Sequence, residues 1–180
     1  MWIFKTHAPD SLSPMLIIFG GLPGTGKTTI ARELSSQLGS MYVRVDSIEQ
    51  AIRDSGTMAQ PINDAGYRVA YAIAEENLRQ GRTVISDSVN PIQLSRDAWI
   101  SVANRAQVRV AEVEIICSDP LQHRQRVETR PSDINGLRLP TWAEVTSREY
   151  EPWDHQHIVI DTAGRRVMES VQELREALPK

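Results

Sequence analysis

The sequence feature that most constrains the fold is the glycine-rich stretch GGLPGTGKTT at residues 20–29. It contains two glycines with four residues between them, followed by a lysine and a hydroxyl residue: Gly21, Gly26, Lys27 and Thr28. The apolar run at 15–19 predicts a buried strand before it. A helix is predicted after it by apolar residues at every fourth position and a closing glycine: Ile30, Leu34, Leu38 and Gly39. A glycine-rich loop between a strand and a helix is typical of a phosphate site.

Each residue type in this stretch suits phosphate binding. Glycines let the backbone curve around an anion, so that its N–H groups point at phosphate oxygens. The helix that begins near Lys27 adds its positive end. We expect Lys27 to reach the β- and γ-phosphates and the Thr28 hydroxyl to hold Mg²⁺. The predicted nucleotide-binding residues are Gly21, Leu22, Pro23, Gly24, Thr25, Gly26, Lys27, Thr28 and Thr29.

Length and composition favour one soluble domain. The chain has 180 residues, enough for a full core, and its net charge of −3 provides no overall attraction to nucleic acid. No apolar run is long enough to span a membrane. The single cysteine, Cys117, excludes an intramolecular disulfide and fits a reducing, cytoplasmic location. We expect an N-terminal tail at 1–14 and one domain at 15–180.

Two aspartates follow predicted strands. Asp46 ends the strand at 41–45, and Asp87 ends the short strand at 83–86. Ligands of open α/β sheets bind at the carboxyl ends of strands, so both carboxylates are candidate site residues. Asp46 is a candidate base for an attacking hydroxyl, or the cap of the next helix in a capping box with Glu49. Asp87 is a candidate Mg²⁺ ligand, or a plain loop carboxylate.

The apolar pattern and the positions of proline predict two further helices. One begins at Pro61 with an apolar face, Ile62, Ala65, Val69 and Ile73. Some residues of this helix lie outside the apolar face, and they either line a substrate pocket or form an amphipathic surface: Tyr67, Arg68, Tyr71 and Asn77. The other begins after Asn90, which we expect to cap it with Pro91 at its first position.

The region after the strand predicted at 108–117 is rich in arginine. Asp119 and Pro120 begin a helix in which Arg126 and Arg130 are four residues apart, and therefore share a face. This face is either a polyphosphate site or a solvated basic surface paired with acids. His123 is expected at the surface. The proline- and glycine-bounded loop at 131–140 predicts, together with the arginine helix, a mobile lid at about 123–140 that excludes water.

A last apolar run at 157–160 predicts a fifth strand, and residues 167–178 predict a final helix. Strands therefore alternate with helices along the chain. This order predicts an α/β fold with a parallel sheet and helices on both faces.

With these motifs the chain resembles the small P-loop kinases known as AAA-type predicted kinases. That group is similar to chloramphenicol phosphotransferase and to the kinase domain of bacteriophage polynucleotide kinase. The matching segments are GLPGTGKTT at 21–29, VDS at 45–47, ISDSVNP at 85–91, HRQRVETR at 123–130 and IDTAG at 160–164. Only the first segment is highly specific, and the others contribute by their order and spacing.

The resemblance implies a three-layer P-loop fold with a five-stranded parallel sheet, and transfer of the γ-phosphoryl group of ATP, with Mg²⁺, to a hydroxyl group. It implies that Asp46 contacts the acceptor hydroxyl and acts as base, and that Arg126 and Arg130 belong to the lid. It implies that Thr162, Ala163 and Gly164 contact adenine. Polynucleotide kinases carry an arginine three positions after this aspartate, where this chain has Glu49. That departure favours a small-molecule acceptor.

Two classes of function remain open at this point. The first is a kinase with Lys27, Asp46, Arg126 and Arg130 as catalytic residues, acting on a small-molecule alcohol or, as the alternative, on a nucleoside or polynucleotide 5′-hydroxyl. The second is a nucleotide-binding switch that regulates a partner. An aspartate at the end of the second strand has a use in a kinase and none in a switch, so the kinase is favoured. We expect no membrane partner, and a monomer or dimer.

Overall fold

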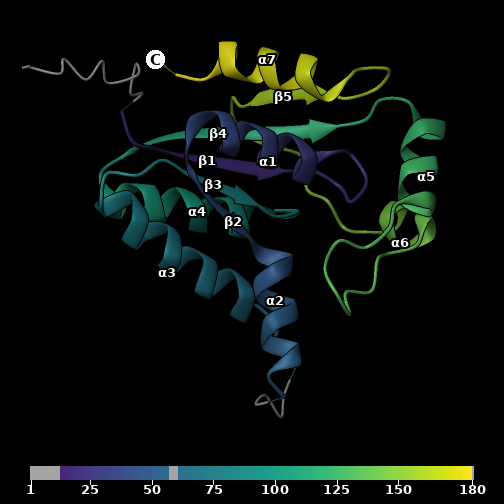
Figure 1. Ribbon diagram of the computed structural model, residues 1–180, viewed down its shortest axis with the longest axis horizontal. Coiled ribbons are helices and arrows are strands. Elements are labelled where there is room, and N and C mark those ends of the chain that lie inside the picture. The colour runs from purple at the N-terminus through teal and green to yellow at the C-terminus, as the bar shows by residue number, and fades with distance from the viewer. Residues whose placement is uncertain (1–12, 57–60, 180) are drawn as a thin grey trace, which may run out of the picture.

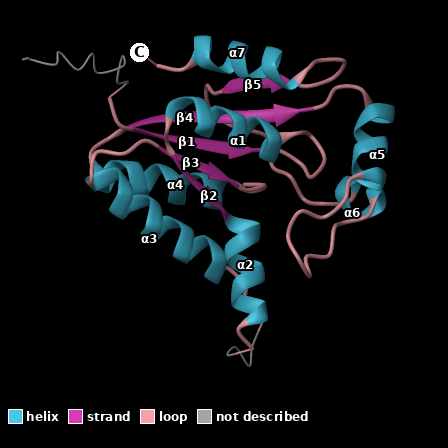
Figure 2. Cartoon of the chain, in the orientation of Figure 1, coloured by secondary structure: helices cyan, strands magenta, loops and turns pink. Residues whose placement is uncertain are grey.

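The computed structural model describes residues 13–56 and 61–179, which form a three-layer α/β fold (Figures 1 and 2). A five-stranded sheet, parallel throughout, has the order β2-β3-β1-β4-β5. Its strands are β1 (Met15–Gly20), β2 (Met41–Arg44), β3 (Val84–Asp87), β4 (Arg109–Ile116) and β5 (Ile158–Asp161). The predicted five-stranded parallel sheet is therefore confirmed.

Helices cover both faces of the sheet. They are α1 (Lys27–Leu38), α2 (Val45–Asp54), α3 (Ala65–Arg79), α4 (Gln93–Ala106), α5 (Pro120–Thr129), α6 (Trp142–Thr146) and α7 (Val167–Ala177). The α1 and α7 helices pack together on one face, and α3 and α4 pack together on the other. In Figure 1, α5 and α6 lie beyond the carboxyl ends of the strands, and α2 projects away from the sheet.

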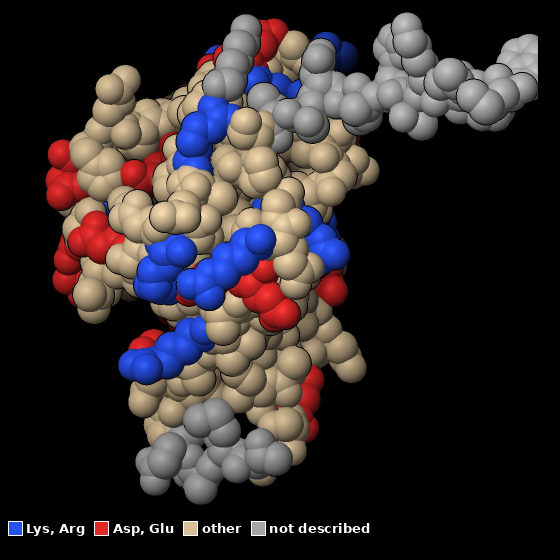
Figure 3. Space-filling view, turned by 90° about the vertical axis from the view of Figure 1, so that its left-hand side faces the viewer, with Lys and Arg blue, Asp and Glu red and all other residues tan. Residues whose placement is uncertain are grey.

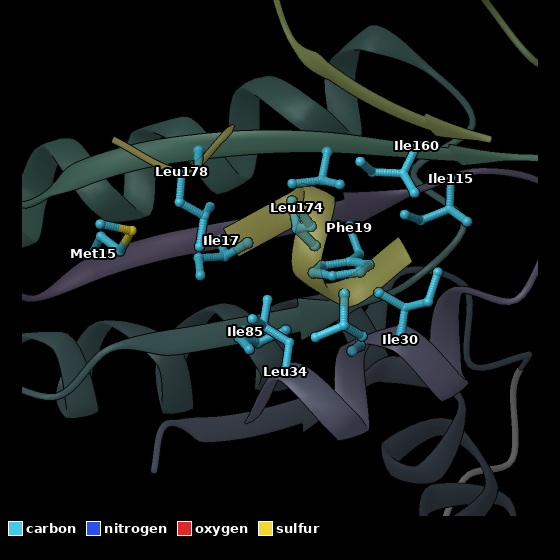
Figure 4. Close-up of a cluster of buried hydrophobic side chains, with 14 residues drawn as sticks. Met15, Ile17, Phe19, Ile30, Leu34, Ile85, Ile115, Ile160, Leu174 and Leu178 are labelled. Atoms are coloured by element: carbon cyan, nitrogen blue, oxygen red, sulfur yellow. The ribbon is translucent and has the colours of Figure 1, made fainter. Parts of the chain in front are cut away.

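The central strand, β1, supplies both halves of the core. Its side chains alternate between the two faces, as the period of a strand requires. Ile17 and Phe19 join the cluster under α1 and α7, which Figure 4 shows, while Leu16 and Ile18 join the cluster under α3 and α4. All residues of β1 are buried, which explains why its sequence is continuously apolar.

The position of β1 also locates the candidate site. It lies between β3 and β4, with β2 and β3 on one side and β4 and β5 on the other, so the strand order reverses direction at β1. The carboxyl end of a strand at such a switch point is where open α/β sheets bind ligands. The glycine-rich stretch leaves β1 at this point.

The loop after β3 differs from the prediction. The α4 helix begins at Gln93 with Ile92 as its N-cap, so Asn90 is not a helix cap. Asn90 is instead buried with φ 47°, and its Nδ2 donates a hydrogen bond to the Phe19 carbonyl at 2.8 Å. The Asn90 side chain therefore links the loop after β3 to the end of β1, because a buried amide group requires a hydrogen-bond partner.

The predicted apolar face of the third helix is also wrong. Its buried residues are Gly66, Ala70, Ala74 and Leu78, whereas Val69 is exposed. Gly66 faces inward where α2 lies close, since a Cβ there would come within 2.3 Å of Glu49 Cγ, and Ala70 and Ala74 pack in the core cluster on this face of the sheet. Hydrophobicity alone favoured the larger aliphatic residues, but the space available selects glycine and alanine.

Some expectations concern the surface and the N-terminal segment. Most of the expected tail at 1–14 lies outside the described residues. No helix in the described part of the chain combines the length and apolar character that crossing a membrane requires. On the face that Figure 3 shows, basic and acidic side chains lie side by side rather than in one basic field.

Candidate active site

The glycine-rich loop has the backbone that phosphate binding requires. Gly21, Gly24 and Gly26 all have positive φ, and Gly26 is the N-cap residue of α1 without any side-chain cap. A Cβ on Gly21 would lie 2.2 Å from the Ile115 carbonyl oxygen, so no other residue fits there. The N–H groups of the first turn of α1 therefore have no side-chain cap, and an anion would serve them.

Lys27, the first residue of α1, is buried within the loop that it follows. Its Nζ donates a hydrogen bond to the Leu22 carbonyl at 2.9 Å, and the Thr25 hydroxyl donates to the same oxygen, also at 2.9 Å. Burial lowers the pKa of Lys27 to about 8, although the nearby carboxylates of Asp87 and Asp46 oppose that shift. An ammonium group desolvated in this way gains most from an anionic ligand.

One cavity joins the residues that the sequence analysis singled out. It has a volume of about 1010 Å³ and lies between the glycine-rich loop, the ends of β2 and β3, the helices α2, α3 and α4, and residues 136–140. Six predicted site residues line it: Pro23, Lys27, Thr28, Asp46, Asp87 and Arg130.

Asp46 lies in the first turn of α2 and faces this cavity. The helix begins two residues earlier than the cap interpretation expects, with Arg44 as its N-cap and no side-chain cap hydrogen bond. The interpretation of Asp46 as a helix cap is therefore wrong. Its carboxylate is half exposed and lies 3.7 Å from Arg44 Nη2, a distance at which the two charges attract without a tight bond.

Asp87 occupies the buried carboxyl end of β3. The Tyr42 hydroxyl donates a hydrogen bond to its Oδ2 at 2.6 Å, and Arg44 Nε lies 3.9 Å from the same oxygen. Burial and the Asp87 charge raise the pKa of Tyr42 well above its ordinary value, so the phenol stays a donor. Asp87 also lines the cavity.

Arg44 is a site residue that the sequence analysis missed. It is the last residue of β2, is buried, and lies among three carboxylates: Asp46, Asp87 and Asp133. Its pKa is affected most by burial, which lowers it, but the Asp133 hydrogen bonds and the Asp87 charge raise it overall. The sequence did offer one signal for Arg44. It lies near the end of a predicted strand, as do the candidate site residues Asp46 and Asp87.

The two arginines predicted to share a helix face are separated. Arg126 lies in α5 and donates to Thr162, with Nη1 2.7 Å from the hydroxyl and Nη2 3.0 Å from the carbonyl oxygen. Arg130 is the C-cap residue with extended backbone, so it is no longer on the helix, and it lines the cavity. Burial lowers the pKa of Arg130, and its Nε has no partner among the described residues.

His123 is buried rather than on the surface. Its Nε2 lies 2.8 Å from the Pro23 carbonyl oxygen, and because that oxygen only accepts, Nε2 carries the proton. Its ring also meets the Trp142 ring edge-on, with centroids 5.1 Å apart. His123 thereby joins α5 and α6 to the glycine-rich loop. A histidine four positions after a helix cap gave no signal of that long-range contact.

The segment predicted to contact adenine follows β5. The Thr162 hydroxyl is buried and donates to the Thr25 carbonyl at 2.8 Å, which fixes it against the glycine-rich loop. The Ala163 N–H donates to Asp161 Oδ1 and the Gly164 N–H to Gln122 Oε1, both at 3.0 Å. None of the three lines the large cavity.

Arg148 and Arg96 were also missed as site residues. Arg148 lines the cavity and is exposed. Arg96 is fully buried and donates to the Asn90 carbonyl at 3.0 Å and to the Glu151 carbonyl at 2.6 Å. Its guanidinium lies 4.4 Å from the Trp153 ring centroid. Arg96 therefore fixes the loop after β3 to the segment that follows Arg148.

Comparisons with known proteins agree with this architecture. Residues 16–147 match the family model described as an AAA domain. An uncharacterized protein of Mycobacterium tuberculosis is 30% identical over 177 residues that cover 91% of this chain. The chain spans about a third, 35%, of the length of that relative. A cytidylate kinase of Ignicoccus hospitalis is 25% identical and covers 77% of this chain and 76% of its own length.

Solved structures share the fold at low sequence identity. The APS kinase CysC of Mycobacterium tuberculosis, in complex with AMPPNP and APS, aligns with a TM-score of 0.67 and 17% identity. That alignment covers 91% of this chain and 96% of the other. Because the family model matches most of the chain, the chain belongs to the AAA domain family and has the fold of the small P-loop kinases.

Proposed function

We propose that this protein is an ATP-dependent kinase that transfers the γ-phosphoryl group to a hydroxyl of a small molecule. The observation that carries the proposal is the single cavity lined by Lys27, Asp46, Asp87 and Arg130. A phosphate site and a free carboxylate in one cavity are what hydroxyl phosphorylation requires. Kinases among the relatives support the general class of reaction.

The residues present fit ATP and Mg²⁺. The uncapped N-terminus of α1 and the positive-φ glycines suit the phosphates, and Lys27 adds the charge. Thr28 and Asp87 supply the hydroxyl and carboxylate oxygens that Mg²⁺ prefers. No cluster of three metal-ligating side chains occurs in residues 13–56 and 61–179, which suits a metal held mainly by phosphate oxygens and water. Thr162, Ala163 and Gly164 stay the predicted adenine contacts.

In this proposal Asp46 receives the proton of the acceptor hydroxyl. The acceptor oxygen then bonds to the γ-phosphorus while the bond to the β–γ bridging oxygen breaks, so ADP leaves with both bonding electrons. Lys27 and Arg130 offset the negative charge that moves to the phosphoryl oxygens. Asp46 is half exposed and has no tight partner, so its carboxylate is available to accept a proton.

The alternatives are less well supported. A polynucleotide acceptor would use a basic residue where this chain has Glu49, whose carboxylate is paired with Arg53 at 3.1 Å. A nucleotide switch needs no cavity of this size beyond its phosphate site. We therefore keep the small-molecule kinase as the proposal.

Screening tests the proposal directly. The protein is incubated with Mg²⁺ and γ-labelled ATP beside alcohols, nucleosides, antibiotics and oligonucleotides with free 5′-hydroxyls. We expect a labelled phosphomonoester from one of the small molecules, and none with Lys27→Ala, which removes the phosphate-loop charge. A labelled oligonucleotide would select the polynucleotide alternative. Release of label only as inorganic phosphate in every case would favour the switch.

A further inference from the structure

The arginines that line the cavity differ in whether their charge is already matched. In the described part of the chain there are six of them: Arg44, Arg53, Arg68, Arg130, Arg138 and Arg148. Four form ion pairs with carboxylates: Arg44 with Asp133, Arg53 with Glu49, Arg68 with Asp64 and Arg138 with Glu144. Within residues 13–56 and 61–179, no carboxylate lies within ion-pair distance of Arg130 or Arg148. The charges of these two guanidinium groups are therefore available to an anion in the cavity.

Arg148 stands at the start of a segment that is held firmly in place. It lies two positions after the last residue of α6, outside the lid predicted at about 123–140, and its side chain is exposed. Three residues later, the Glu151 N–H donates to the Pro91 carbonyl at 2.8 Å, and the Gln93 N–H donates to Glu151 Oε2 at 2.5 Å. The buried Arg96 guanidinium donates to the Glu151 carbonyl at 2.6 Å. The backbone near Arg148 is thus fixed to the loop between β3 and α4.

The same segment also packs against the glycine-rich stretch. A Cβ on Gly20 would lie 2.6 Å from Cζ2 of Trp153, so the indole ring covers the end of β1 directly. The Gly21 N–H donates to the Val89 carbonyl at 3.0 Å, which joins the stretch to the loop after β3. The segment that begins at Arg148 and the glycine-rich stretch therefore belong to one packed unit. A charged side chain on such a support is positioned before a ligand binds.

The charge of Arg148 acts on two parts of the cavity. Burial is the largest cause of the lowered pKa of Lys27, and the charges of Arg130 and Arg148 lower it further. Burial raises the pKa of Glu49, and the charge of Arg148 opposes that shift. Lys27 belongs to the phosphate loop, whereas Glu49 lies one turn of α2 after the proposed base, Asp46. Arg148 is thus within electrostatic range of both the phosphate loop and the acceptor side, and the group that passes between them is the transferred phosphoryl group.

We propose that Arg148 is a catalytic residue that binds the γ-phosphoryl group while this group passes from ATP to the acceptor. The inference rests on the proposed kinase function and deepens it, because it assigns a second arginine, beside Arg130, to the transferred group. The Arg148 guanidinium donates hydrogen bonds to the non-bridging phosphoryl oxygens while the bond to the acceptor oxygen forms and the bond to the bridging oxygen breaks. It keeps its own protons, since the acceptor proton goes to Asp46 and the bonding electrons leave with ADP. The contact is made to ATP and not to ADP.

Nucleotide binding tests this contact without an acceptor. The unchanged chain, Arg148→Ala and Arg148→Lys are titrated with ADP and with AMPPNP, each with Mg²⁺, by isothermal titration calorimetry. We expect Arg148→Ala to weaken AMPPNP binding about tenfold and to keep ADP binding within about twofold, because only hydrogen bonds to the third phosphate are lost. Arg148→Lys should recover part of the loss, since lysine keeps the charge without the planar fork.

Arg124→Ala is the matched control for these titrations. Arg124 is also exposed, but it lies on α5 outside the cavity and is paired with Glu128 at 2.9 Å. This variant should bind both nucleotides as the unchanged chain does. Both alanine variants change exposed side chains, so we expect melting temperatures close to that of the unchanged chain. Equal loss of ADP and AMPPNP binding with Arg148→Ala, or no loss of either, would overturn the inference.

Steady-state kinetics with the acceptor found in the screen above separate a contact to the phosphoryl group from a contact to the acceptor. We expect Arg148→Ala to lower kcat about a hundredfold and to keep the KM for the acceptor within about twofold. A raised KM for the acceptor with an unchanged kcat would assign Arg148 to acceptor binding and overturn the inference.

The two proposals fail in different ways. Selective loss of AMPPNP binding with Arg148→Ala, without phosphorylation of any compound in the screen, would support the contact between Arg148 and the γ-phosphate and overturn the kinase function. Phosphorylation of a small molecule at the same rate by Arg148→Ala and by the unchanged chain would support the kinase and overturn the role of Arg148.

Discussion

Arg44 and Asp133 join the end of β2 to the loop that follows α5. Arg44 Nη1 donates to both carboxylate oxygens of Asp133, at 3.0 and 2.8 Å. Arg32 of α1 contacts the same carboxylate at 2.6 Å. The Arg44 hydrogen bonds, assisted by the second arginine, hold the pKa of Asp133 at about 2, so the carboxylate is charged throughout the physiological range. This contact holds residues 131–140 against the body of the site.

We predict that Asp133→Asn loosens the proposed lid. Loss of a charge-assisted contact whose carboxylate is 41% exposed should cost about 1 kcal/mol, which corresponds to about fivefold faster amide exchange in residues 131–140. Hydrogen exchange with and without an ATP analogue measures it. Asp97→Asn on the exposed face of α4 is the control. Unchanged exchange with Asp133→Asn would mean that this contact does not hold the loop.

The two lid arginines should differ in what they support. Arg126 ties α5 to Thr162, so Arg126→Ala should lower the melting temperature by about 2–4 °C, the effect of about 1 kcal/mol on a domain of this size. Arg130 lines the cavity with an unpartnered Nε, so Arg130→Ala should reduce kcat by about a hundredfold and leave the melting temperature close to that of the unchanged protein. Thermal unfolding and steady-state kinetics separate the two. The reverse pattern would assign Arg126 to catalysis.

His155 should make stability depend on pH. Its ring nitrogens face Glu112 and Asp154, and those bonds raise the pKa of His155, with the Glu112 contact as the largest cause. Glu114, the neighbouring carboxylate on β4, is bonded to His157 instead. A raised folded-state pKa adds stability that is present in full below the unfolded value of about 6.5 and is lost as pH rises through the folded pKa.

His155→Gln should therefore destabilise the protein more at pH 6 than at pH 8.5. The partial exposure of the ring limits the difference to about 1 kcal/mol, or about 2–4 °C in melting temperature. Thermal unfolding at both pH values measures it, with the unchanged chain as reference. An equal destabilisation at the two pH values would show that the charge on His155 contributes nothing.

Local signals in the sequence predicted much of this structure. The apolar run of β1, the glycine pattern and the helical repeat up to Leu38 are short-range features, and the structure has each of them at the expected residues. The helix start at Asp119 is also confirmed, since a capped helix start needs only a few neighbouring residues. The order of strands and helices likewise predicted the parallel sheet.

Tertiary contacts decided the rest. Asn90 has the composition of a cap, but the Phe19 carbonyl engages its side chain from a distant strand. His123 is polar and lies in an arginine-rich helix. It is nevertheless buried, because the carbonyl of Pro23 provides a hydrogen-bond partner for its ring. Arg130 leaves the helical face because α5 ends at Thr129. The periodicity of a single sequence does not reveal such partners. The hydrogen-bond partner lies 71 positions away for Asn90 and 100 positions away for His123.

The most direct test of the proposed reaction is the effect of Asp46→Asn on phosphoryl transfer. The side chain does not cap α2, so the substitution keeps its shape and removes only the proton acceptor. We predict unchanged affinity for an ATP analogue, an unchanged melting temperature and a loss in kcat of about a hundred- to ten-thousandfold, measured with the acceptor found in the screen. A kcat equal to that of the unchanged protein would contradict the role of Asp46 as the base, and with it the central argument for a kinase.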